Sequence, residues 1–231
     1  MFVAAAGYYI NDYYDVKIDL INKPRKVVVG REIRRRQVLM AHTVLNLMGV
    51  LLGAWVSLWI GAINLIVSVL LWWYSNQLKK LPFWGNLMVA VLTGSTLLVT
   101  MVYYNTNHIL GYTYAFFALG ITLVREIIKD VEDMGGDENY GAHTLPIVLG
   151  VRKTKLVLYV ISSCYVGLLT IFLAVINHVY LSLYFGILSI PFLYFVRRLY
   201  DADTKKEFAQ LSEFAKWIII AGIMSMLIFG I

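Results

Sequence analysis

Long apolar runs separated by short polar connections dominate the chain. They fall at 38–58, 61–78, 82–104, 109–128, 155–177, 179–197 and 212–231. A helix needs about 20 apolar residues to cross the hydrocarbon core of a bilayer. The pattern therefore predicts seven membrane-spanning helices. The opening segment, from Met1 to Tyr14, is also apolar but too short to span, and it resembles the end of a further helix.

The composition agrees with a protein that lies in a membrane. Of the 231 residues, 60% are apolar or aromatic and only 15% are charged, whereas soluble domains average about 45–50% and about 25%. This excludes a disordered chain, a disulfide scaffold and a soluble nucleic-acid-binding domain, so the expected partner is the bilayer and not nucleic acid. The single cysteine, Cys164, allows no internal disulfide.

The distribution of charge predicts the orientation in the membrane. The 20 Lys and Arg residues cluster after every second apolar run, and all 14 acidic residues lie at the same ends. The connections near 59–61, 105–108 and 177–179 carry no charge. Because cytoplasmic loops are rich in Lys and Arg, we expect a multi-pass protein of the plasma membrane whose charged loops, and any active site on them, face the cytoplasm.

Two acidic motifs stand at these charged ends. The first places Asp12, Asp15 and Asp19 at positions i, i+3 and i+7, which share one face of a helix, and Asn11 joins that face four residues before Asp15. The second repeats the spacing with Asp130, Asp133 and Asp137. Gly135 and Gly136 are expected to end the second helix, so that Asp137 would lie on the following loop.

Carboxylates that share a helical face repel one another, and a bound cation relieves that repulsion. Oxygen ligands without histidine favour Mg²⁺, which typically bridges one or two carboxylates to phosphate groups of a substrate. Two matched clusters therefore indicate a Mg²⁺–diphosphate site. The simpler alternative is that each cluster is a solvated helix end balanced by neighbouring Lys and Arg.

The motifs resemble the signatures of the UbiA superfamily of intramembrane prenyltransferases. The first signature is similar to residues 11–19 followed by Asn22-Lys23-Pro24, and the second to residues 130–137 followed by Gly141-x-x-Thr144-Leu145-Pro146. Between them, Tyr74 and Lys79 resemble the Tyr…Lys element of the family. The resemblance implies an all-α membrane bundle with a central cavity, formed by one domain over 1–231. Since the family has nine helices, about eight are expected here and the chain is expected to be truncated at its N-terminus.

The resemblance also implies an activity, namely Mg²⁺-dependent transfer of a prenyl group from a prenyl diphosphate to a membrane-associated acceptor. Asp12, Asp15, Asp130 and Asp133 would be catalytic, and the metal would be held by these four together with Asp19 and Asp137. Diphosphate or phosphate contacts would come from Asn11, Arg25, Lys26, Lys79, Arg125 and Lys129. Lys26 stands where the family has arginine, so it keeps the charge but loses the bidentate fork.

The strings Leu78-Lys79…Gly85-Asn86 and Arg125 to Asp133 are similar to the ether-lipid branch of the family. That branch implies a geranylgeranyl donor and geranylgeranylglyceryl phosphate as acceptor. The alternatives are an aromatic acceptor such as 4-hydroxybenzoate, a cation transporter and an inactive fragment. A transporter is disfavoured because its charged groups would lie near the bilayer midplane.

Overall fold

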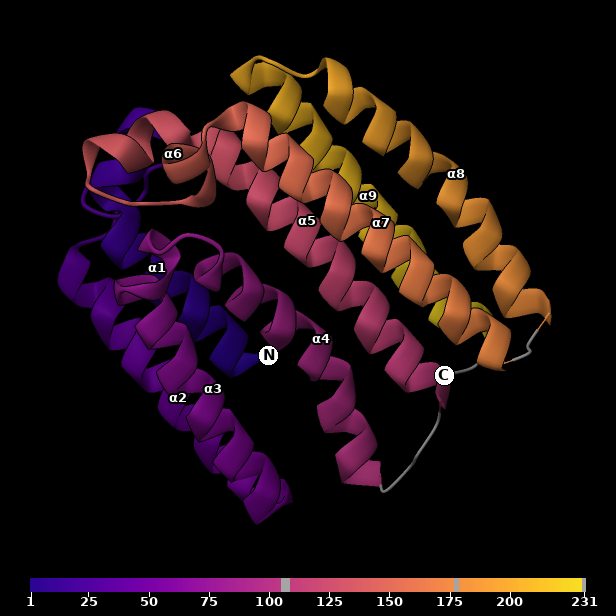
Figure 1. Cartoon of the computed structure of the whole chain (residues 1–231). Coiled ribbons are helices and arrows are strands. Elements are labelled where there is room, and N and C mark those ends of the chain that lie inside the picture. The colour runs from indigo at the N-terminus through magenta and orange to yellow at the C-terminus, as the bar shows by residue number, and fades with distance from the viewer. Residues whose placement is uncertain (105–108, 177–178, 230–231) are drawn as a thin grey trace. The chain divides into compact units, whose positions relative to one another are not determined.

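The structure is a computed structural model that describes residues 1–104, 109–176 and 179–229. The described part is helical and contains no β-strand (Figure 1). Its elements are α1 (Phe2–Asn22), α2 (Arg35–Val56), α3 (Leu58–Asn76), the 3₁₀ turn η1 (Leu78–Lys80), α4 (Trp84–Tyr104), α5 (Ile109–Asn139), α6 (Leu145–Leu149), α7 (Val151–Ile176), α8 (Val179–Asp201) and α9 (Lys205–Phe229). The predicted all-α class is confirmed.

Six of the described helices, α2, α3, α4, α5, α7 and α8, are long and apolar enough to cross a membrane. They correspond to the first six predicted spans. The seventh predicted span lies within α9, whose described part does not meet the same criterion, so that span stays a prediction. The connection predicted near 59–61 falls at Ser57, and those at 105–108 and 177–178 lie outside the described residues.

The prediction that Gly135 and Gly136 end a helix is wrong. Helix α5 continues through both glycines to Asn139, so Asp137 is helical. Gly136 instead allows Asn22 to approach the backbone of α5 closely, because a Cβ atom at this position would lie 2.6 Å from Cγ of Asn22. Two consecutive glycines weaken a helix, but neighbouring turns and the contact with Asn22 maintain this one.

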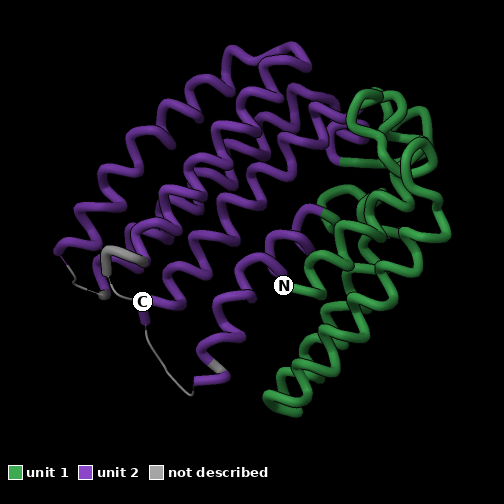
Figure 2. The backbone as a smooth tube through the Cα atoms, turned by 180° about the vertical axis from the view of Figure 1, so that it is seen from behind, with its two compact units in different colours: residues 1–85, 135–144 green, residues 86–134, 145–231 purple. Residues whose placement is uncertain are grey.

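The chain divides into two compact units (Figure 2). Unit 1 comprises residues 1–85 and 135–144, and unit 2 comprises residues 86–134 and 145–231. In unit 1, helices α1, α2 and α3 pack on one another. Small residues permit this packing, since Gly49 faces Val3 and Phe2 of α1, and Gly7 faces Leu71 of α3. The last turn of α5 also belongs to this unit.

Unit 2 is built around α5. In the most apolar stretch of that helix 78% of the residues are buried, against 22% or less in the other five spans. Aromatic rings hold α5 to α7 and α8, and these are Phe116, Phe117, Tyr165, Phe185 and Phe192. The hydroxyl groups of Tyr114 and Ser225 lie 2.6 Å apart and join α5 to α9. The second acidic motif therefore begins on the most enclosed helix.

Candidate functional site: two acidic clusters with amide and lysine partners

The first motif lies on the C-terminal half of α1, as predicted. The amide of Asn11 donates a hydrogen bond of 2.8 Å to Oδ2 of Asp15, one turn further along the helix. Asp12 lies on the same helix, and Asp19 lies in its last turn. The i, i+3, i+7 spacing therefore places three carboxylates along one side of a continuous helix.

Lys79 reaches this motif from η1. Its ammonium forms an ion pair with Oδ1 of Asp15 and lies 3.5 Å from Oδ1 of Asn11. Both charged side chains are largely enclosed, with 12% exposure for Lys79 and 16% for Asp15. The turn is held tightly, because a Cβ at Gly85 would lie 2.8 Å from Cα of Lys79. The structure thus brings together three of the predicted site residues, Asn11, Asp15 and Lys79.

Burial and neighbouring charges shift the pKa values of two groups in this cluster, Asp12 and Lys79. Partial burial, together with the neighbouring Asp15 carboxylate, raises the pKa of Asp12, and the Lys79 ammonium opposes that shift. Burial lowers the pKa of Lys79, although Asp15 acts in the opposite direction. A carboxylate that resists ionisation beside another carboxylate is a group that an added cation would stabilise. The cluster therefore fits a divalent metal ion better than it fits a purely structural role.

The second motif has an amide partner that the sequence did not reveal. Asn86, the second residue of the string Gly85-Asn86, donates a hydrogen bond of 2.8 Å from Nδ2 to Oδ2 of Asp130. Asn86 is buried, and its Oδ1 accepts no hydrogen bond among the described residues. A buried acceptor without a donor costs about 1–3 kcal/mol. This oxygen beside Asp130 fits a site that receives a cation or a donor group from a ligand.

Arg125 and Lys129 lie one turn apart on α5 and share a single carboxylate, that of Glu126. Its Oε1 accepts a hydrogen bond of 2.9 Å from Nη1 of Arg125, and its Oε2 accepts one of 3.0 Å from Lys129. Glu126 is only 8% exposed. It was not among the predicted site residues, yet it fixes two of them. A Glu one residue after an Arg and three before a Lys was the available signal.

Residues 135–144 belong to unit 1 and are fastened at two points. The N–H of Gly136 donates a 3.0 Å hydrogen bond to Oδ1 of Asn22, and the N–H of His143 donates a 2.8 Å bond to the carbonyl of Lys80. Asp137 lies one residue after the first of these contacts. Asn22 of the Asn22-Lys23-Pro24 element and Lys80 of η1 thus both hold the segment that contains Asp137, the last aspartate of the second motif.

The other predicted phosphate contacts lie apart from these clusters. Arg25 and Lys26 are exposed on the turn after α1. In the neighbouring basic run, Arg35 donates a hydrogen bond of 3.2 Å to the carbonyl of Tyr13 and lies over its ring. These residues are available on the surface of unit 1.

Within the described ranges, no group of three or more His, Cys, Asp or Glu side chains converges closely enough to hold a metal ion. The donor chemistry nevertheless fits Mg²⁺, because the available groups are carboxylate and amide oxygens. Two observations are consistent with that fit. The Oδ1 of Asn86 accepts no hydrogen bond among the described residues, and the pKa of Asp12 is raised.

Comparison with known proteins agrees with this chemistry. Residues 1–220 match the UbiA prenyltransferase family. The chain therefore belongs to the UbiA prenyltransferase family and is an integral membrane enzyme of the prenyl-transferring class. Several relatives with 30–39% identity are named digeranylgeranylglyceryl phosphate synthase. One of them, from Methanosphaera stadtmanae, is 34% identical over 94% of this chain and 80% of its own length.

Solved structures share the fold. A structure described for digeranylgeranylglyceryl phosphate synthase in membranes matches with a TM-score of 0.75 and 26% identity, over 98% of this chain and 81% of its own. A UbiA homolog from Archaeoglobus fulgidus, bound to DMAPP and Mg²⁺, matches with a TM-score of 0.66 and 14% identity, over 96% and 83%. The second likeness concerns the fold alone.

Proposed function

We propose that this enzyme transfers a geranylgeranyl group from its diphosphate to the free hydroxyl of geranylgeranylglyceryl phosphate. The observation that carries the proposal is the Asn11–Asp15–Lys79 cluster in unit 1. It places amide and carboxylate oxygens, which suit a metal ion, beside an ammonium group, which suits a diphosphate. The identity of the acceptor is supported by the relatives named for this reaction at 34% and 35% identity.

The proposed cofactor is Mg²⁺, supported by the oxygen ligands of both motifs and by the metal in the A. fulgidus homolog. Asp12, Asp15 and Asp19 would hold one Mg²⁺, and Asp130 and Asp133 would hold a second, supported by Asp137. When bound, the metal would neutralise the negative charge that grows on the departing diphosphate. We further propose that the two units act as one domain over 1–231, since the family match crosses both.

The protein groups would then act on the diphosphate and the acceptor. Lys79, Arg125 and Lys129 donate hydrogen bonds to diphosphate oxygens and stabilise them as the carbon–oxygen bond of the donor breaks. The acceptor hydroxyl attacks the allylic carbon and forms the new ether bond, the diphosphate leaves, and the hydroxyl proton passes to the released diphosphate. Arg25 and Lys26 bind the phosphate of the acceptor. Water must be kept from the reacting carbon, because it would otherwise capture the allylic cation.

The proposed site faces the cytoplasm of the plasma membrane. This orientation is supported by the concentration of Lys and Arg at the ends that carry the motifs. Cysteines introduced singly at Lys26 and at Ser57 into a Cys164→Ala background test it. A membrane-impermeant thiol reagent added to sealed right-side-out vesicles should label the Ser57 variant and leave the Lys26 variant unlabelled. Labelling of the Lys26 variant in sealed vesicles would contradict the orientation.

The test of the reaction is a Mg²⁺-dependent assay with radiolabelled geranylgeranyl diphosphate in liposomes. Geranylgeranylglyceryl phosphate and 4-hydroxybenzoate are offered in parallel. Product with the glycerol lipid alone supports the proposal, whereas product with the phenol alone overturns the acceptor. Asp12→Ala and Asp130→Ala should abolish turnover without preventing membrane insertion. Glu213→Gln, which removes an exposed carboxylate paired with Lys216, is the matched control and should retain activity.

A further inference from the structure

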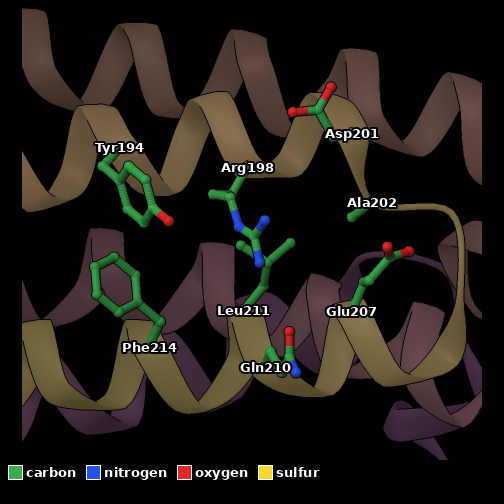
Figure 3. A pocket seen from close by; sticks show the side chains of 8 residues that line it. All are labelled: Tyr194, Arg198, Asp201, Ala202, Glu207, Gln210, Leu211 and Phe214. Carbon is green, nitrogen blue, oxygen red and sulfur yellow. The ribbon is translucent and has the colours of Figure 1, made fainter.

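A small pocket lies between the end of α8 and the start of α9, entirely within unit 2 (Figure 3). Its volume is about 210 Å³, below the 300 Å³ or so at which whole-ligand pockets begin. It is therefore large enough for a headgroup or a fragment but not for a whole prenyl substrate. None of the predicted prenyltransfer residues lines it.

One part of the pocket is charged and holds both signs. Arg198 extends from α8 towards α9 and stands between the aromatic pair and Glu207 (Figure 3). Among the described residues Arg198 has no ion pair or hydrogen bond. Asp201 lines the same pocket. The guanidinium can therefore offer its donors to a ligand at little cost in existing contacts.

Glu207 is a fixed negative charge in this pocket. Its Oε2 accepts hydrogen bonds of 2.9 Å from the N–H of Asp203 and 2.8 Å from both the N–H and the hydroxyl of Thr204. These donors lower the pKa of Glu207 to about 2, and Arg198 contributes to the same shift. The carboxylate is thus ionised at neutral pH and held in place by the start of α9.

The other part of the pocket is aromatic. The rings of Tyr194 and Phe214 meet edge to face, with centroids 5.8 Å apart and planes at 76°. Tyr194 is 55% exposed and lies one turn before Arg198. Since α8 is one of the six candidate spans, these residues occupy the end of a membrane helix. Tyr and Arg at such positions commonly lie at the level of lipid headgroups.

We propose that this pocket binds the zwitterionic headgroup of a membrane phospholipid. The phosphate lies on Arg198, the ammonium lies towards Glu207 and Asp201, and the first carbons of the lipid follow the Tyr194–Phe214 pair. A purely anionic headgroup would meet two carboxylates, and a purely cationic one would meet the guanidinium. A headgroup with one charge of each sign satisfies both sides of the pocket.

The competing explanation is that Arg198 only sets the orientation of α8, as a cytoplasmic basic residue. Its neighbour Arg197 distinguishes the two explanations, because it is exposed, carries the same charge and does not line the pocket. Glu207→Gln is a second probe. Glutamine retains the side-chain acceptor for the start of α9 but removes the negative charge.

The experiment uses the full chain in nanodiscs of equimolar phosphatidylethanolamine and phosphatidylglycerol with identical acyl chains. Native mass spectrometry after gentle detergent transfer then counts each lipid that remains bound. The wild type should retain phosphatidylethanolamine at least fivefold over phosphatidylglycerol. Arg198→Gln should lose this retention and Arg197→Gln should keep it. Glu207→Gln should shift retention towards phosphatidylglycerol.

Equal retention of the two lipids by the wild type, or equal loss in the two arginine variants, would overturn the proposal. If Arg198→Gln does not insert, the wild-type preference and its shift in Glu207→Gln decide the question, since both must be observed. A parallel arm adds free phosphoethanolamine to the wild type. Displacement of the bound lipid by millimolar phosphoethanolamine supports headgroup recognition, and retention governed by acyl chain length instead of headgroup contradicts it.

Discussion

The side-chain oxygen of Asn22 accepts a buried hydrogen bond from the N–H of Gly136, 114 residues further along the chain, at 3.0 Å. Asn22 is the last residue of α1, which carries the first acidic motif, and Gly136 lies near the end of α5, which carries the second. The contact explains why a glycine stands inside that helix, since a side chain would collide with the asparagine.

Gly136→Ala should therefore destabilise the protein. The new methyl group must displace Asn22, and overpacking of this kind costs about 1–3 kcal/mol. The measurement is the thermal midpoint in detergent, together with turnover. Gly135→Ala is the matched control, because nothing lies within 4 Å of a Cβ at that position. The control should be neutral or slightly stabilising, and equal effects of the two substitutions would contradict the role of the contact.

Asp15→Asn should be strongly destabilising as well as inactivating. It leaves the enclosed ammonium of Lys79 without its counter-charge, and because the pair is partly buried the cost should lie below the figure for a fully buried pair, which is about 3–5 kcal/mol. Thermal unfolding of the single and double variants with Lys79→Met measures the coupling. Glu213→Gln breaks the exposed pair with Lys216 and should cost less than about 1 kcal/mol. A coupling near zero between Asp15 and Lys79 would show that the pair does not stabilise the site.

Asn86→Leu should weaken Mg²⁺-dependent turnover by about 10- to 100-fold, the range found when a partner of a metal ligand is removed. The substitution takes the 2.8 Å hydrogen bond away from Asp130 but keeps a side chain of similar size. The Mg²⁺ concentration that gives half-maximal rate should rise. Asn139→Leu serves as the control, since the exposed side-chain amide of Asn139 donates to the carbonyl of Gly135 and, among the described residues, to no motif carboxylate. An unchanged Mg²⁺ dependence in Asn86→Leu would rule out a role at the metal.

Glu207→Ala should lower stability in a manner that depends on pH. Hydrogen bonds to the carboxylate hold the pKa of Glu207 at about 2 in the folded protein, against 4.5 as the ordinary value. The stabilisation is therefore complete above pH 4.5 and disappears as the pH falls through about 2. Thermal midpoints of wild type and variant should differ at pH 7 and converge towards pH 2. A difference that stays constant with pH would refute this linkage.

The sequence by itself determined the local structure. Apolar runs of about 20 residues predicted the six helices that are long and apolar enough to span, because helix length and bilayer thickness are fixed quantities. The spacing of the first motif predicted one helical face, and the Asn11–Asp15 hydrogen bond confirms it. The motif spacing also indicated the family. Each of these features depends on residues within a few turns of one another, where 3.6-residue periodicity decides proximity.

Only the tertiary structure decided which distant side chains meet. Lys79 lies 64 residues from Asp15, and Asn86 lies 44 residues from Asp130, and no periodicity connects such positions. The helix through Gly135 and Gly136 could not be predicted either, because the glycines were expected to act locally, as a stop. Their conformation depends on Asn22, which approaches from another helix. The helix propensity of a glycine is unfavourable by about 1 kcal/mol. A hydrogen bond contributes a similar amount, about 0.5–1.5 kcal/mol, so the buried contact with Asn22 offsets a preference of that size.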